Sequence, residues 1–222
     1  MIAHVYAILP HLSRIQPDIM VNRRSFLTAV TAATLGFASR ASAQPQSLPP
    51  IVARGSEVTV SRRLMVARPD LPVATDPHLL FYVQHSINRS LIVYAARLGP
   101  DGKLDPDRPV EAFWRRFDEE GQKRQLNFFE RVFAFGVSSR RIGEGRYAAR
   151  VAGYRSREAI VDLDERGQPR ALLRVGERTV RVVYAYAQAD DVGFIPKIHH
   201  VDVFGYDLAT GEAIRERIRL DM

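Results

Sequence analysis

The chain has no cysteine among its 222 residues. This absence excludes a thiol nucleophile, iron–sulfur clusters held by cysteine, covalently attached c-type haem and a lipidated cysteine anchor. It also excludes disulfide bonds, which are common in proteins that work in oxidising compartments. The stability of the fold must therefore come from its core alone.

Several familiar motifs are also missing. The sequence has no phosphate-binding glycine loop, no dinucleotide fingerprint, no complete calcium loop and no Gly-x-Ser-x-Gly elbow. It lacks the run of about 20 apolar residues that a membrane-spanning helix needs, so we expect no stable membrane anchor. These absences leave no motif that indicates catalysis, and we expect no cofactor.

The most informative segment that is present lies near the start of the chain. An arginine pair is followed by a short apolar run, from Phe26 to Phe37, and then by small residues. This order is typical of an export signal, and paired arginines favour the twin-arginine route. The residues that carry the resemblance to twin-arginine signals are Arg23, Arg24, Phe26 and Leu27, with cleavage expected after Ala43.

This interpretation predicts a bacterial protein that is released into the periplasm. Residues 1–43 would be the export signal, with residues 1–19 a mis-assigned start upstream of Met20. The expected partners during export are the twin-arginine translocase and signal peptidase. Removal of residues 1–43 takes away four arginines and one aspartate, and the net charge falls from +7 to +4. That mild charge permits contact with an anionic envelope component and does not indicate a nucleic-acid partner.

The rest of the chain is expected to form a flexible leader, residues 44–56, and a single β-rich domain, residues 57–222. Turn signals separate about nine to ten short apolar or alternating segments, which predicts an antiparallel β-sandwich or barrel with one short helix. The helix is expected over Gln122–Phe133, where a strand pair is the alternative. The expected strands are Glu57–Val66, Leu79–His85, Ser90–Leu98, Val110–Phe117, Arg146–Ala152, Ala159–Leu163, Arg170–Val175, Val180–Ala187, Ile198–Gly205 and Ala213–Leu220.

Four ordered blocks of residues resemble a known family. They are Phe81-Tyr82-Val83-Gln84 with Val93-Tyr94, Asp101-Gly102-Lys103-Leu104 with Trp114, Phe133-Ala134-Phe135-Gly136, and Pro196-Lys197 with Phe204-Gly205 and Thr210-Gly211. As a set they resemble the bacterial domain of unknown function 4833, over about Leu79 to Ile218. The resemblance implies a grouping and no activity.

Polar residues at the end of the Leu79–His85 segment form the first candidate ligand site. The residues concerned are Gln84, His85, Asn88 and Arg89, with Lys197 and His199 as companions from another strand. The alternative is that Ser86–Arg89 is a hairpin turn whose side chains bond the local backbone. Adjacent strand residues face opposite ways, so we expect His199 to point to the interior and His200 to be more exposed.

Other residues favour structural roles. Trp114, the only tryptophan, shares an apolar strand face with Val110 and Ala112 and is expected in the core. In the last strand Ile214, Ile218 and Leu220 should face inward. Its arginine row, at 215, 217 and 219, could hold phosphate or lipid head groups or could pair with Glu212 and Glu216.

Three functional hypotheses follow from these residues. The first is a non-enzymatic envelope domain that binds a ligand or partner. The alternatives are a small periplasmic hydrolase and a metal-binding domain, each using His85 or His199 with a carboxylate.

Overall fold

The computed structural model describes residues 53–190 and 197–220. The expected export signal, its arginine pair and the cleavage site lie outside the described residues. Within them the protein is mainly β, which confirms the broad fold prediction. The strands are β1 (Ala53–Ser61), β2 (Leu79–His85), β3 (Leu91–Ala96), β4 (Val110–Arg116), β5 (Gln122–Gln125), β6 (Val137–Gly143), β7 (Arg146–Val151), β8 (Ala159–Leu163), β9 (Pro169–Val175), β10 (Arg178–Asp190), β11 (Lys197–Asp207) and β12 (Ala213–Leu220).

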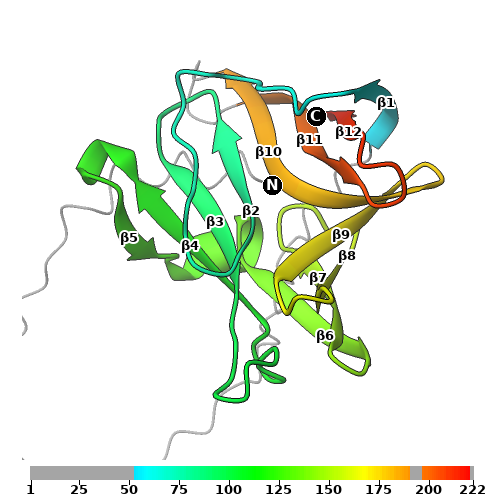
Figure 1. The fold of residues 1–222 in the computed structure, drawn as a ribbon. Coiled ribbons are helices and arrows are strands. Elements are labelled where there is room, and N and C mark those ends of the chain that lie inside the picture. The colour runs from blue at the N-terminus through cyan, green and yellow to red at the C-terminus, as the bar shows by residue number, and fades with distance from the viewer. Residues whose placement is uncertain (1–52, 191–196, 221–222) are drawn as a thin grey trace, which may run out of the picture.

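Nine of these strands form a curled, half-barrel sheet in the order β5-β4-β3-β2-β10-β9-β8-β7-β6 (Figure 1). Strand β10 is the hub, because β11 pairs along its other edge and leads on to β12 and β1. Its first residues, Arg178–Arg181, pair with β9, and Tyr184–Ala187 pair with β2. The β2–β10 pairing is parallel, whereas every other pairing between these strands is antiparallel. The wholly antiparallel prediction is corrected at this one place.

Each of the ten predicted strands is present, and β2, β8 and β12 have the predicted bounds. Strand β6 was not predicted, and β5 lies within Gln122–Phe133, where a strand pair was the alternative to a helix. Both are polar and largely exposed at the two ends of the curled sheet, where a strand needs no apolar face. Strand β1 begins at Ala53, so residues 53–56 of the expected leader belong to a strand.

The helix expected over Gln122–Phe133 is wrong. Its first residues form β5, and the remainder leads into a single π turn, η2 (Glu130–Ala134). A second short turn, η1 (Phe117–Glu119), is the other helical element among the described residues. The turn is followed by Gly136, which lies so close to the backbone of Arg131 that an added Cβ would be 1.8 Å from the carbonyl oxygen, so this position requires glycine.

Apolar residues are buried on both faces of the central strands. All six residues of β3 are buried, as its two-sided apolar pattern predicts. One face packs inside the curl around Ile92, Tyr94 and Trp114. The other packs beneath the segment between β1 and β2, around Tyr82, Tyr184 and Phe204. Trp114 is 3% exposed, which confirms its place in the core.

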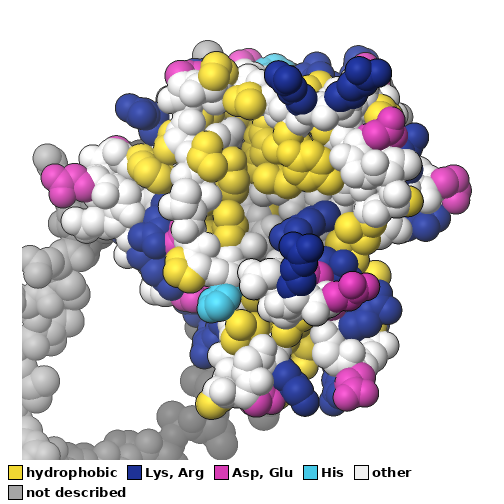
Figure 2. All heavy atoms as spheres, viewed as in Figure 1, with side chains coloured by type: hydrophobic (Ala, Val, Ile, Leu, Met, Phe, Trp, Pro, Cys, Tyr) yellow, Lys and Arg dark blue, Asp and Glu magenta, His cyan; other side chains and the backbone are white. Residues whose placement is uncertain are grey.

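Charged side chains of both signs are distributed over the surface. On the face shown in Figure 2, lysine and arginine side chains surround a central area of hydrophobic side chains. Most described carboxylates close to an arginine are paired with it, as Asp76 is with Arg115 and Asp207 with Arg178. The surface charge is therefore locally balanced at most places.

Candidate functional site

The polar residues at the end of β2 form a turn and do not line an open rim. The Oδ1 atom of Asn88 accepts a hydrogen bond from the Ser90 backbone N–H at 2.8 Å, as an Asx turn does. Gln84 is 2% exposed and donates its Nε2–H to the Pro72 carbonyl oxygen at 2.9 Å. Arg89 is exposed. The hairpin-turn alternative describes Ser86–Arg89 better than a binding rim does.

His85 is the one buried histidine among the described residues. Its side chain is 3% exposed, and its ring packs edge-on against Trp114 with centroids 6.2 Å apart. The Asn88 backbone N–H approaches its Nδ1 atom at 3.4 Å. Burial disfavours the charged imidazolium and lowers the pKa of His85 from 6.5 to about 4.

The prediction for the histidines of β11 is wrong. The His199 side chain is 42% exposed and that of His200 is 20% exposed, which reverses the expected order. The reason is a bulge: Gln188 pairs with His200 and Ala189 pairs with Ile198, so His199 has no cross-strand counterpart. His199 leaves the alternating pattern and bonds the exposed Asp190 carboxylate at 2.6 Å.

The structure does not assemble these residues into a catalytic or metal site. His85 packs on Trp114, and His199 pairs with Asp190, so the two contact different groups. Ser86 Oγ donates to the Ala189 carbonyl oxygen at 2.5 Å and accepts from its N–H at 2.8 Å. Within residues 53–190 and 197–220, no three histidine and carboxylate side chains converge as metal ligands would. Lys197 begins β11, and the structure does not describe its side chain.

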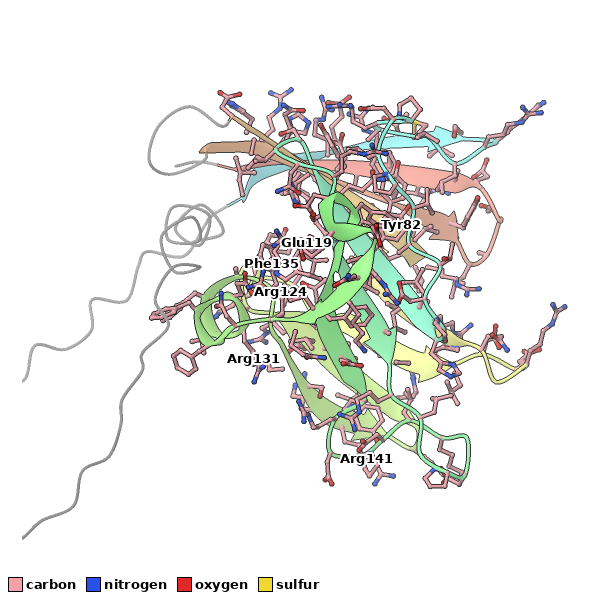
Figure 3. All side chains as sticks on the ribbon, turned by 90° about the vertical axis from the view of Figure 1, so that its left-hand side faces the viewer. Tyr82, Glu119, Arg124, Arg131, Phe135 and Arg141 are labelled. Atoms are coloured by element: carbon pink, nitrogen blue, oxygen red, sulfur yellow. The ribbon has the colours of Figure 1, made fainter. Side chains whose placement is uncertain are left out.

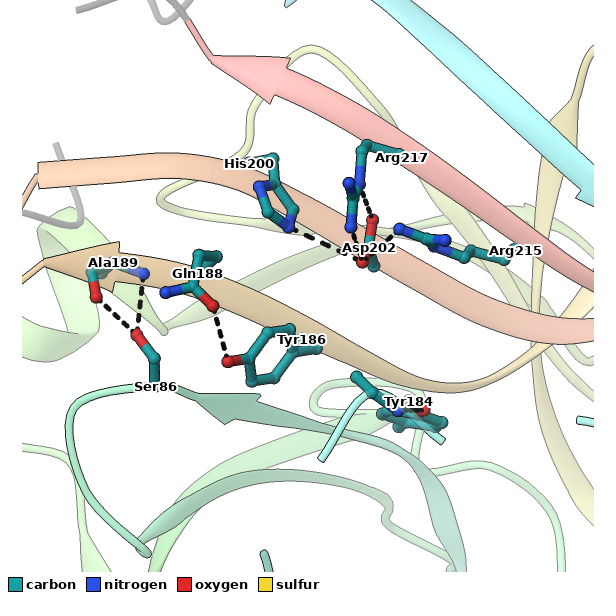
Figure 4. Close-up of polar contacts among 10 residues, drawn as sticks. Ser86, Tyr184, Tyr186, Gln188, Ala189, His200, Asp202, Arg215 and Arg217 are labelled. Carbon is teal, nitrogen blue, oxygen red and sulfur yellow. Dashed lines mark hydrogen bonds and ion pairs between the residues drawn. The ribbon is translucent and has the colours of Figure 1, made fainter. Parts of the chain in front are cut away.

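Two arginines of the β12 row, Arg215 and Arg217, bond a single buried carboxylate (Figure 4). Asp202 on β11 is 3% exposed. It accepts hydrogen bonds from Arg217 at 2.8 and 2.9 Å and from Arg215 at 3.0 Å. Although burial acts in the other direction, these hydrogen bonds and the positive charges hold the pKa of Asp202 below its usual value. The predicted pairing of Arg215 and Arg217 with Glu212 and Glu216 is replaced by this cross-strand cluster, in which both guanidinium groups are bonded to Asp202 and are not arranged around an open anion site.

Sequence reasoning missed an apolar cavity inside the curled sheet. Its volume is about 140 Å³, and eight strands contribute to its wall. Almost every lining side chain is apolar, and Arg157 is the one charged residue among the described residues of the wall. The lining residues on strands are Phe81, Val83, Tyr94, Ala149, Val151, Ala159, Leu173, Val182, Ala185, Ala187, Val201, Val203 and Ile218.

Strand alternation explains why this wall is apolar. Val201 and Val203 on β11 face the cavity, whereas Asp202 between them faces the arginine cluster. The Tyr94 hydroxyl points its O–H at the Phe135 carbonyl oxygen, 2.9 Å away, and is thereby satisfied. The cavity wall thus offers a ligand apolar surface and few free polar atoms.

The polar edge of the cavity is a bridge between Arg157 and Glu216. Arg157 lies between β7 and β8, and its Nη1 atom is 2.5 Å from the Glu216 carboxylate on β12. It also donates to the Arg174 carbonyl oxygen. The Glu216 side chain is only 5% exposed. The bridge therefore ties the β7–β8 connection to β12 and brings a neutralised ion pair to the cavity edge.

In the part of the chain that the structure describes, no helix has the length and apolar character needed to cross a membrane. Searches of curated proteins and of solved structures give no match to the chain. A family model, Domain of unknown function (DUF4833), matches residues 81–217, which agrees with the extent of the resemblance seen in the sequence. The chain belongs to the DUF4833 family.

Proposed function

We propose that this protein is a non-enzymatic β-domain that binds an apolar ligand inside its curled sheet. The observation that carries the proposal is the cavity, whose wall is apolar apart from Arg157. A concave apolar pocket with a few polar groups at its edge is the usual form of a small-molecule site. The arginine pair at residues 23 and 24 supports the further proposal that the protein is exported by the twin-arginine route and works in the periplasm.

The size of the cavity limits the ligand. Protein cavities of about 150 Å³ accept a group the size of a benzene ring. A volume of about 140 Å³ therefore takes one aromatic ring or a short aliphatic segment, and any larger ligand must extend past the edge. There it meets Tyr154 and Arg157, which can offer hydrogen bonds.

The charge at the edge favours a neutral ligand. The Glu216 carboxylate already neutralises Arg157 at 2.5 Å, and a ligand carboxylate would have to compete with it. Displacing one partner of a buried ion pair leaves the other uncompensated, which is costly. The ligand class that fits best is an uncharged apolar molecule with one hydrogen-bonding group.

The fluorescence of Trp114 can report ligand binding in this cavity. Trp114 is the single tryptophan, and its ring packs against Phe135, a cavity-lining residue, with centroids 5.2 Å apart. Titration with N-phenylnaphthylamine, a neutral apolar dye, should change the Trp114 emission and saturate. The dye should brighten on transfer from water to the apolar wall.

Cavity-filling variants test where the dye binds. Ala185→Leu and Ala159→Phe place extra side-chain volume in the cavity and should abolish saturable dye binding. Ala209→Phe adds a larger side chain at an exposed turn and is the matched control. If dye binding persists in both filled variants while they remain folded, the dye does not bind in this cavity and the proposal fails.

The bridge between Arg157 and Glu216 provides a test of the charge of the ligand. Glu216→Gln removes the carboxylate and leaves the positive charge of Arg157 at the cavity edge. The variant should gain affinity for the anionic dye anilinonaphthalene sulfonate relative to N-phenylnaphthylamine. A wild-type protein that already prefers the anionic dye would contradict the assignment of a neutral ligand.

A further inference from the structure

Three phenylalanines beside the η2 turn are exposed to solvent. Phe128, Phe129 and Phe133 are 69%, 48% and 39% exposed. The rings form a connected group, with centroids 5.7 Å apart between Phe128 and Phe129 and 6.3 Å apart between Phe129 and Phe133. Scattered exposed apolar residues are ordinary, but a contiguous aromatic group marks an interaction surface. We call these three residues the phenylalanine patch.

The turn that carries the patch is held firmly. Asn127 and Glu130 bond each other reciprocally: the Asn127 N–H donates to the Glu130 carboxylate at 2.8 Å, and the Glu130 N–H donates to Asn127 Oδ1 at 2.9 Å. Ala134 is fully buried and Phe135 is 4% exposed, so they anchor the end of the turn in the core. The fold buries one phenylalanine of this segment and presents three others.

Three arginines lie around the patch, and the exposed carboxylate of Glu119 in the same region is paired with Arg116. Arg124, Arg131 and Arg155 are exposed, and none of them forms an ion pair with a carboxylate in the described part of the chain. Arg155 donates to the Val132 carbonyl oxygen at 3.4 Å, which places it beside the turn. Figure 3 shows Arg124 and Arg131 near Phe135, around the same turn. The nearest carboxylate in sequence, Glu130, is buried and is bonded to the Asn127 backbone N–H inside the turn.

We propose that the phenylalanine patch docks the protein on a bilayer that contains anionic phospholipid. Aromatic rings partition favourably into the boundary between head groups and acyl chains. Unpaired arginines next to such rings are attracted to anionic head groups, by about 1 kcal/mol for each charge. Both features lie on or beside one turn, η2. The inference goes beyond the ligand cavity and does not depend on it.

Co-sedimentation of the full chain with lipid vesicles tests the proposal. The protein should bind vesicles of phosphatidylcholine mixed with phosphatidylglycerol and bind vesicles of phosphatidylcholine alone much more weakly. Raised salt should weaken the binding, because the electrostatic part is screened. Equal binding to both vesicles would overturn the role given to the arginines.

Matched variants assign the binding to the patch. The double variant Phe128→Ser with Phe129→Ser should lower the partition coefficient by about a hundredfold or more, since two buried phenyl rings at about 1.5 kcal/mol each correspond to about 3 kcal/mol. Phe117→Ser, at an exposed phenylalanine of η1, should leave binding unchanged. Any contribution from residues 1–43 is common to all these proteins. Undiminished binding by the folded double variant would overturn the proposal.

Two charge-reversal variants test the role of the arginines separately from that of the rings. Arg124→Glu should reduce binding to the mixed vesicles about tenfold or more, because two charge units change at about 1 kcal/mol each. Arg141→Glu makes the same change further along β6, away from the turn (Figure 3), and should have little effect. Sedimentation velocity without lipid supplies the alternative outcome: if the patch mediates a dimer that the double serine variant abolishes, its occupant is a second copy and the bilayer proposal fails.

Discussion

The buried imidazole of His85 should make the protein lose stability in mild acid. The ring is 3% exposed beside Trp114, and burial lowers the pKa of His85 from 6.5 to about 4. In the unfolded chain the same ring is hydrated and titrates near its ordinary value of about 6.5. Between about pH 4 and pH 6.5, His85 is therefore protonated in the unfolded state and neutral in the folded state.

The sign and size of the effect follow from proton linkage. Stability rises with pH wherever the unfolded state binds more protons, so the contribution of His85 is complete above about pH 6.5 and falls as the pH drops towards 4. A shift of about 2.5 pH units, at about 1.36 kcal/mol for each unit, corresponds to about 3 kcal/mol lost by pH 4. That is a large share of the stability of an ordinary domain.

Urea unfolding at pH 7, 5 and 4 measures this loss, and His85→Gln is the comparison protein. Other groups act in the same direction: His200 has its pKa lowered by burial and by Arg217, and the pKa of the Asp202 carboxyl is also lowered. They are common to both proteins, so the difference between the two stability profiles belongs to His85. Wild type should lose about 3 kcal/mol more than His85→Gln between pH 7 and pH 4.

A direct titration provides the second measurement. The imidazole resonances of His85 should titrate near pH 4 in the folded protein. Parallel stability profiles for wild type and His85→Gln, together with a titration midpoint near 6.5, would show a hydrated ring and refute the reasoning.

Three further predictions concern separate parts of the chain. Trp114→Ala should cost about 3–5 kcal/mol in the free energy of unfolding, measured by urea denaturation, because a fully packed indole is lost; an unchanged midpoint would mean that the ring is in solvent. Gly136→Ala should cost about 1–3 kcal/mol or prevent folding, since the new methyl group meets the Arg131 carbonyl oxygen; normal thermal melting would contradict this close approach. Replacing Arg23 and Arg24 together by lysine should leave the precursor in the cytoplasm, as cell fractionation would show, and undiminished export would rule out the twin-arginine route.

The strands that the sequence predicts well are those with apolar residues and clear turns. Ala159–Leu163 and Ala213–Leu220 have their predicted bounds because turn residues flank them and their apolar residues face a core. Strands β5 and β6 carry mainly polar residues at the sheet ends, so no hydrophobic period indicates them. Their structure depends on pairing with a neighbouring strand, and the sequence of the segment itself does not show that pairing.

The helix prediction failed because the same pattern has two physical meanings. The apolar residues at 126, 129, 132 and 133 have the spacing expected for the buried stripe of a helix. In the structure Leu126 is buried, whereas Phe129 and Phe133 are exposed. Periodicity reports where apolar side chains occur and does not report whether a core covers them.

The candidate site was predicted only in part, and the cavity was not predicted at all. His85 could be recognised as unusual because it ends an apolar strand. The position of His199 depends on a bulge that no residue in the sequence indicates. The cavity depends on the parallel pairing of β2 with β10, which joins residues about a hundred positions apart. Local patterns cannot specify a wall that eight strands share.

The hub position of β10 also determines the order in which the chain can fold. Strands β2 to β5 and strands β6 to β9 form two runs in which each strand pairs with its neighbour in sequence. Such local hairpins form within microseconds. Among the strand pairings, the two runs are joined only through β10, which pairs with β2 at one end and β9 at the other, as Tyr184 with Tyr82 and Val180 with Leu173. Because closing a loop of about a hundred residues is slow, the docking of β10 should limit the folding rate, and a nascent chain that ends before residue 178 should remain open.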